Sequence, residues 1–249
     1  MQRYFVNDAI DENYIQLAGN DYHHITRVMR MTIGDKISVV FSTKEVAICK
    51  ITKIADDHLL AKVLEKFTED RELPVNVTIA CGLLKGEKFD LVVQKATELG
   101  VHKIIPISSE RTIVKLDNEK AKKRQERWRK IAKEAAEQSE RLVVPSIDVP
   151  KSITTFISEC EKYDYKLVAY EEAGRTNEKN QFFQTLEKVT KDNSLVLVIG
   201  PEGGLSELEV EQLQLAGFLP CGLGPRILRA ETAPLYALSA MSFYFELMR

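Results

Sequence analysis

Hydrophobic and polar positions in the first part of the chain follow the pattern of short strands. Residues 36–41, 47–54 and 58–67 are rich in β-branched residues and partly alternate between apolar and polar positions. Short strands joined by short turns are typical of a small barrel. The first part of the chain is therefore expected to form a compact β domain.

The pattern is interrupted at residues 68–74, which are charged, lack apolar periodicity and end in Pro74. Such a segment is typical of a linker between domains. We therefore expect one domain over residues 1–70 and a second over residues 74–249.

The second domain alternates apolar strands with amphipathic helices. Strands are expected at residues 75–84, 103–107, 166–170 and 194–199. A helix with apolar residues at helical spacing ends at Gly100, and a long basic helix is expected over residues 118–142. Strands that alternate with helices predict an α/β domain with a mostly parallel sheet.

A glycine-rich loop, GPEGG at residues 200–204, directly follows one of these strands. Ser206 and Glu209 after it have the spacing of a capping box, and Leu205 and Val210 that of a hydrophobic staple, so a helix begins there. In an open α/β sheet, ligands bind where strands end and helices begin. A turn that needs Gly and Pro only for its geometry is the alternative.

A second loop has the sequence LGPRILRAETAP over residues 223–234, with Thr232 as the expected N-cap and Pro234 in the first turn of a helix. Arg226 and Arg229 in this loop suggest an anionic partner. The alternative is that these arginines form ion pairs with Glu231 or Glu202.

Composition excludes several classes of protein. The chain has 249 residues with 35 basic and 37 acidic side chains, a formal net charge of −2, so it is neither disordered nor generally basic. Its four cysteines are too widely spaced for a zinc-ribbon or CxxC motif and HExxH is absent, so we expect no bound metal. GxxxxGK[ST] and GxGxxG are also absent, which disfavours an NTPase or an NAD enzyme. No signal peptide or membrane span is visible, which favours a cytoplasmic protein.

Several motifs in order along the chain resemble the SPOUT methyltransferases, and specifically the RsmE family. They are the GPEGG and ILRAETA loops, QKATELGV at residues 94–101, SERT at residues 109–112, EAAEQSER at residues 134–141, and HHITRVMR at residues 23–30. The resemblance implies a PUA-like β-barrel followed by an α/β SPOUT domain whose C-terminal region forms a trefoil knot. It also implies methylation of N3 of a uridine in 16S ribosomal RNA of the small subunit, with S-adenosylmethionine as cofactor.

In this family the cofactor lies in the knot, held largely by the backbone of three loops. By position, the resemblance assigns cofactor binding to Leu167, Ala169, Tyr170, Ile199, Gly200, Pro201, Glu202, Gly203, Gly204, Leu223, Gly224, Ile227, Leu228, Thr232 and Ala233. We expect Arg229 to stabilise negative charge on the uracil carbonyl oxygens, and Glu231 to orient the Arg229 side chain.

RNA binding requires positive surface. The candidates are Arg3, His24, Arg27 and Arg30 in the first domain, and Lys122, Lys123 and Arg124 in the basic helix. A merely solvated helix face, and packing or capping by His24, are the alternatives.

The last helix, expected over residues 232–248, is apolar on almost every side and must be buried against its own domain or a partner. The family pattern places it in both the knot and a homodimer interface. Two other functions remain open: a non-catalytic RNA-binding protein, and a SPOUT enzyme that acts on transfer RNA.

Overall fold

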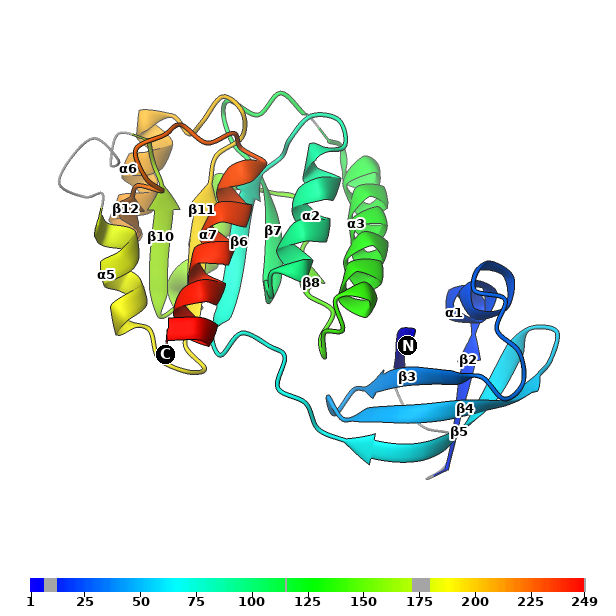
Figure 1. The fold of residues 1–249 in the computed structure, drawn as a ribbon. Coiled ribbons are helices and arrows are strands. Elements are labelled where there is room, and N and C mark those ends of the chain that lie inside the picture. Colours follow the sequence, from blue (N-terminus) through cyan, green and yellow to red (C-terminus); the bar gives the residue numbers. More distant parts are fainter. Residues whose placement is uncertain (7–12, 115, 172–179, 249) are drawn as a thin grey trace. The chain divides into compact units, whose positions relative to one another are not determined.

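The chain folds into two compact units, Met1–Glu72 together with Ala136–Val143, and Leu73–Ala135 together with Val144–Arg249. The computed structural model shown in Figure 1 describes residues 1–6, 13–114, 116–171 and 180–248. No helix among these residues is long and apolar enough to cross a membrane.

The first unit is a curled five-stranded sheet with a short helical segment. Its elements are β1 (Arg3–Val6), β2 (Tyr14–Ala18), α1 (Gly19–His23), η1 (His24–Val28), β3 (Lys36–Phe41), β4 (Val46–Ile54) and β5 (His58–Phe67). The strand order is β1-β3-β4-β5-β2, with only β1 and β3 parallel. The sheet curls into a half-barrel, with β1 and β2 at opposite edges and unpaired in the described residues, so the small β domain that the sequence predicts is confirmed.

A segment from the middle of the chain completes this unit. Leu142 packs with Val40 and Val46 of the sheet. The Glu72 carboxylate binds the Arg141 guanidinium and accepts the Leu142 N–H at 2.8 Å. The long helix α3 (Asn118–Gln138) ends at Gln138, not at residue 142 as expected. Glu140, with a φ of +57°, turns the chain so that residues 141–143 pack on the first unit instead of continuing the helix.

The second unit is an α/β sandwich around a parallel sheet. Its elements are β6 (Asn76–Gly82), α2 (Lys88–Glu98), β7 (Lys103–Ser108), α3 (Asn118–Gln138), β8 (Ser146–Ile147), β9 (Lys151–Ser152), α4 (Ile153–Ser158), η2 (Cys160–Lys162), β10 (Tyr165–Ala169), α5 (Gln181–Lys188), β11 (Ser194–Ile199), α6 (Glu207–Leu215), β12 (Leu219–Cys221), α7 (Thr232–Ser242) and η5 (Phe243–Met248). The strand order is β12-β10-β11-β6-β7-β8, with β9 also paired to β7 and every pairing parallel. The predicted α/β domain with a parallel sheet is confirmed.

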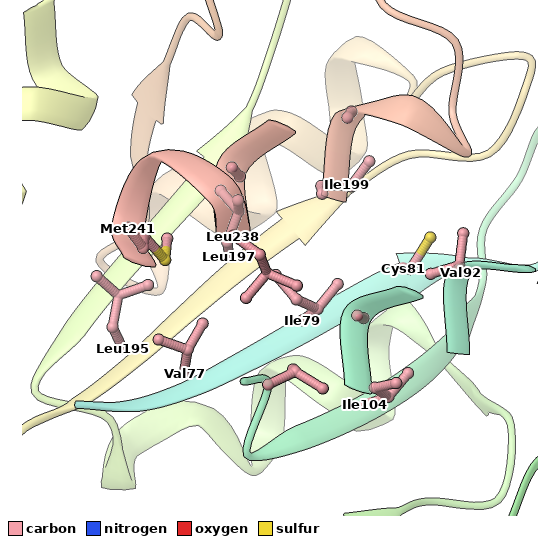
Figure 2. Packing of buried hydrophobic residues seen from close by; sticks show 14 of the residues in the cluster. Val77, Ile79, Cys81, Val92, Ile104, Leu195, Leu197, Ile199, Leu238 and Met241 are labelled. Atoms are coloured by element: carbon pink, nitrogen blue, oxygen red, sulfur yellow. The ribbon is translucent and has the colours of Figure 1, made fainter. Parts of the chain in front are cut away.

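The strands of this sheet are apolar on both faces because helices cover both. Leu195 and Leu197 of β11 point to the face covered by α2, α3, α5 and α7, whereas Val196 and Val198 point to the face covered by α4 and α6. Figure 2 shows the first of these layers, where Leu238 of α7 lies over β6 and β11. This packing holds α7 against the centre of the sheet.

Candidate functional site

The loops at the carboxyl ends of the strands form one cavity in the second unit. It has a volume of about 940 Å³ and is lined by residues that follow β10, β11 and β12, together with the start of α2 and of α7. Because all these strands are parallel, their carboxyl ends meet at the same edge of the sheet. The glycine-rich loop and the arginine-containing loop, far apart in sequence, thus share one cavity.

Nearly all of the residues expected to bind a cofactor line this cavity. They are Ala169, Tyr170, Ile199, Gly200, Pro201, Glu202, Gly203, Gly204, Leu223, Gly224, Ile227, Leu228 and Ala233, and Arg229 and Glu231 line it too. Leu167 and Thr232 are not part of the lining: Leu167 is buried in the core, and Thr232 is the exposed first residue of α7. Thr232 is also not the N-cap expected, because Glu231 occupies that position without a side-chain cap.

The glycine-rich loop is a tight turn anchored by the helix that follows it. The Gly204 N–H donates to Pro201 O at 2.8 Å, and Gly204 has a φ of +70°, a conformation that favours glycine. A Cβ placed on Gly204 would have no heavy atom within 4 Å, so this part of the cavity wall is open to a ligand. The predicted capping box is present, since Ser206 and Glu209 bind each other's backbone N–H.

The first strand of the second unit presses against the same loop. A Cβ on Gly82, at the end of β6, would lie 2.4 Å from Pro201 N and 2.9 Å from Gly200 C. These are backbone atoms that cannot rotate away. Glycine at residue 82 is therefore required for the position of the loop, although residue 82 does not itself line the cavity.

Two carboxylates at the cavity share one lysine. Lys88 Nζ lies 3.6 Å from Glu202 Oε1 and 3.4 Å from Glu231 Oε1, and Glu202 also accepts the Lys85 N–H at 3.1 Å. Partial burial alone would raise the pKa of Glu202, but hydrogen bonds from its own N–H and that of Lys85, with the Lys88 charge, hold it below its usual range. Glu231 Oε2 is buried without a hydrogen-bond partner in the described residues, so an acceptor is left for a donor from outside the chain.

The arginines of the second loop are not used in ion pairs within the described residues. Arg226 and Arg229 are exposed, whereas the carboxylates with which they could have paired, Glu202 and Glu231, contact Lys88 instead. The geometry therefore disfavours the ion-pair alternative and gives Glu231 a partner other than Arg229. The Arg229 guanidinium remains available at the cavity to an anionic or carbonyl group.

Sequence reasoning missed two cationic residues of the cavity, Lys88 and Arg111. Arg111 Nη1 donates to Gly203 O at 3.2 Å. Arg111 lies in the SERT motif, for which the sequence indicates no function, and Lys88 is the first residue of α2. Both residues follow strands whose carboxyl ends lie at the same edge of the sheet as that of β11, so their place at the site can be predicted only when the strand order is known.

The candidate RNA contacts of the first unit differ in accessibility. Arg3 is 4% exposed, and its guanidinium binds Glu69 at 3.0 Å and Glu140 O at 2.6 Å. This burial gives Arg3 a structural role, which corrects its place among the expected RNA contacts. Arg27 and Arg30 are exposed, and the half-buried His24 has Nδ1 3.0 Å from the Tyr4 hydroxyl, so its packing alternative is partly realised.

The candidate contacts of the second unit lie along α3. Lys122 and Lys123 are exposed and Arg124 is half-buried. They lie on different faces of the helix, because successive residues are about 100° apart. Arg124 and Lys123 line a groove that does not include Lys122.

Comparisons with known proteins cover both units. Residues 71–242 match the model of an RNA methyltransferase domain, and residues 17–64 that of an RNA methyltransferase PUA domain. The chain is 46% identical to ribosomal RNA small subunit methyltransferase E of Bacillus subtilis, over 100% of this chain and 99% of that protein. The protein of that name from Synechocystis is 34% identical, over 96% of this chain and 76% of that one.

A solved structure agrees with these relationships. The crystal structure of a ribosomal RNA small subunit methyltransferase E from Neisseria gonorrhoeae, bound to S-adenosyl methionine, matches with a TM-score of 0.85 at 30% identity, over 98% of each chain. The two family models, the relatives and the solved structure thus agree on the same kind of protein. The chain therefore belongs to the ribosomal RNA small subunit methyltransferase E family of RNA methyltransferases, the RsmE family that its motifs resemble.

Proposed function

We propose that this chain transfers a methyl group from S-adenosylmethionine to N3 of a uridine in 16S ribosomal RNA of the small ribosomal subunit. The observation that carries the proposal is the convergence of the GPEGG loop and the ILRAET loop on one cavity of about 940 Å³, with Arg229 exposed at its wall. The substrate would place the enzyme in the cytoplasm.

The cavity suits S-adenosylmethionine in size and chemistry. Its volume lies at the upper end of the range for small-molecule sites. Gly204 leaves open space where a side chain would stand, and backbone groups of residues 200–204 and 223–228 would hold the ligand. Glu231 Oε2, which has no hydrogen-bond partner among the described residues, can accept a hydrogen bond from a donor on the cofactor or the uracil.

The bound cofactor supplies an electrophilic methyl group on a sulfonium cation. Transfer to nitrogen needs alignment more than covalent catalysis, so the rigid loops carry much of the task. The uracil N3 must lose its proton, and negative charge then spreads to the flanking carbonyl oxygens. Arg229 can donate two parallel hydrogen bonds to that charge, because no ion pair within the described residues holds its guanidinium.

The RNA would contact cationic side chains of both units. We assign this role to His24, Arg27 and Arg30 of the first unit and to Lys122, Lys123 and Arg124 of α3. Arg3 is left out because its guanidinium is buried and bound within the first unit.

The outer face of the C-terminal helix supports a homodimer through the second unit. Tyr236, Phe243 and Leu247 are 41%, 55% and 76% exposed, and their spacing places them on one face of α7 and η5. The opposite face, with Met241 and Phe245, is buried in the core. The substitution Phe243→Glu should give a monomer in sedimentation velocity; an unchanged dimer would assign the interface elsewhere.

A trefoil knot in the same region is part of the proposal. The strand β12 lies at the sheet edge beside β10, yet α7, which follows it, packs on β6, β11 and α2. The intervening loop, residues 222–231, passes close to the glycine-rich loop, since both line one cavity. This path is the one that a C-terminal segment threaded behind the loop would take.

The test is mass spectrometry of nucleosides from unmodified small subunits incubated with the enzyme and isotopically labelled S-adenosylmethionine. We expect labelled 3-methyluridine, and its loss with Arg229→Ala. A labelled nucleoside other than 3-methyluridine, or none, would refute the assignment. Transfer RNA incubated in parallel distinguishes the two RNA substrates.

A further inference from the structure

A groove separate from the methyl-transfer cavity runs along α3. It has a volume of about 850 Å³, and its floor is formed by the apolar side chains Val114, Leu116 and Ile131, which also pack against the main core. No residue of the methyl-transfer cavity lines it. The α3 residues along the groove are Lys120, Lys123, Arg124, Glu126, Arg127, Lys130, Ile131 and Glu134.

The spacing of these residues makes the groove continuous along the helix. Apart from Glu126, they recur at intervals of three or four and therefore form one stripe from Lys120 to Glu134. At a rise of about 1.5 Å per residue, this stripe is about 21 Å long. The groove is thus long enough for more than one nucleotide.

The rim of the groove carries cations that no carboxylate of the described residues neutralises. Lys120 is paired with Asp117 at 2.9 Å and Arg127 with Asp90 at 2.7 Å. Within the described residues, Lys123, Arg124 and Lys130 form no ion pair, although Glu126 and Glu134 lie on the same helix. Three positive side chains therefore remain over an apolar floor.

We propose that this groove binds an unpaired segment of the substrate RNA, with bases against Val114, Leu116 and Ile131 and phosphates at Lys123, Arg124 and Lys130. The inference rests on the proposed function, because it assumes an RNA substrate. It extends that function in two ways: the groove along α3 binds single-stranded RNA, and Lys123 and Arg124 belong to this groove whereas Lys122 does not.

Charge and shape together select this occupant. Phosphates are the groups that an unpaired cationic rim attracts, and unstacked bases offer apolar faces that fit an aliphatic floor. A duplex would reach the rim but would keep its bases stacked away from the floor. A second copy of this chain would bring the same cationic stripe to the groove, and like charges would then face each other.

The test measures binding of single-stranded oligouridylate and of a duplex RNA with the same number of phosphates, by fluorescence anisotropy across a salt series. For the single strand, each lost phosphate contact should reduce the slope of log affinity against log salt by about 0.7. We expect Arg124→Ala to reduce the slope by that amount, and Lys123→Ala/Arg124→Ala by about twice as much. Arg129→Ala removes the same charge from the same helix outside the groove and should leave the slope unchanged.

Cross-linking then locates the bases. Oligouridylate containing 4-thiouridine should cross-link to peptides covering residues 113–134 in the wild type, and less in the double variant. Equal effects of Arg124→Ala and Arg129→Ala, equal affinity for single strand and duplex, or cross-links only elsewhere would each overturn the proposal. A lower mass of Lys123→Ala/Arg124→Ala than of the wild type, in sedimentation velocity without RNA, would instead identify a second copy in the groove and would also overturn the proposal.

The two proposals fail in different ways. If the wild type forms 3-methyluridine but the groove substitutions leave RNA binding unchanged, only the groove proposal is refuted. If the groove substitutions weaken binding of single strands but the wild type forms no 3-methyluridine, only the assigned reaction is refuted.

Discussion

Replacing Gly82 by alanine should weaken cofactor binding although residue 82 does not line the cavity. The added Cβ would lie 2.4 Å from Pro201 N, whereas an ordinary contact needs about 3.4 Å or more. Either the strand or the loop must therefore move by about 1 Å. The strand cannot yield easily, because β6 is paired with β11 on one side and with β7 on the other.

The glycine-rich loop is the part that moves, since isolated hydrogen bonds hold it (Gly204 N–H to Pro201 O, Arg111 to Gly203 O and Lys85 N–H to Glu202), whereas β6 is held by a ladder on each side. Inserting a methyl group into a packed site costs about 1–3 kcal/mol. If the loop takes up most of this strain, the affinity for S-adenosylmethionine falls by about tenfold to a hundredfold, since about 1.4 kcal/mol corresponds to a factor of ten.

Isothermal titration calorimetry with S-adenosylmethionine measures this loss, and thermal unfolding followed by circular dichroism measures stability. The matched control is Gly217→Ala, which lies after α6, away from the cavity, with a φ of +87° and no atom closer than 3.9 Å to its Cβ. The control should lower the melting temperature through backbone strain and keep the affinity. Cofactor affinity of Gly82→Ala within twofold of the wild type would refute the reasoning.

Three further predictions concern chemistry, acid stability and thiols. Arg229→Ala should lower turnover about a hundredfold or more while calorimetry gives nearly normal cofactor affinity; an active variant would transfer the role to another residue. Burial alone would raise the pKa of Glu69, but hydrogen bonds and charges from Arg71 and Arg3 hold this pKa below its usual range. The ionised Glu69 therefore stabilises the fold above about pH 4.3, and this stabilisation is lost as the pH falls through the lowered pKa. Urea unfolding between about pH 5 and pH 3 should therefore lose less stability in Glu69→Gln than in the wild type, and parallel curves would contradict this. The four cysteines are all buried, and burial raises the pKa of Cys49 to about 12, so a disulfide reagent should titrate no thiol in the native protein and four after unfolding; rapid native labelling would contradict this burial.

Local patterns were sufficient for several elements of both units, including those that precede and follow the glycine-rich loop. The strands expected over residues 36–41 and 194–199 coincide with β3 and β11, because alternation and β-branching report directly on burial in a sheet. The capping box of Ser206 and Glu209 was also predicted, since it depends on residues only three apart. These features are local, and neighbours in sequence determine them.

Features that depend on distant neighbours could not be predicted in this way. The end of α3 was placed at residue 142, but Leu142 belongs to the first unit because it packs with Val40 and Val46, about a hundred residues earlier. Lys88 was missed for a similar reason: its partners, Glu202 and Glu231, become neighbours only when β11 lies beside β6. Periodicity identifies which face of a strand is buried, but it does not identify the adjacent strand.

In a chain of net charge −2, the charged side chains at the cavity and along α3 are arranged differently. At the cavity, Lys88 pairs with both Glu202 and Glu231 and so links the two cofactor loops. Along α3, by contrast, Lys123, Arg124 and Lys130 have no such partner in the described residues, and their field extends outward. A polyanion is therefore drawn first to the helix, whereas the cavity offers the exposed Arg229 to a single uracil. Neutralising Arg124 should slow capture of the RNA, and removing Arg229 should slow transfer to an RNA already bound, so the two substitutions separate KM from kcat.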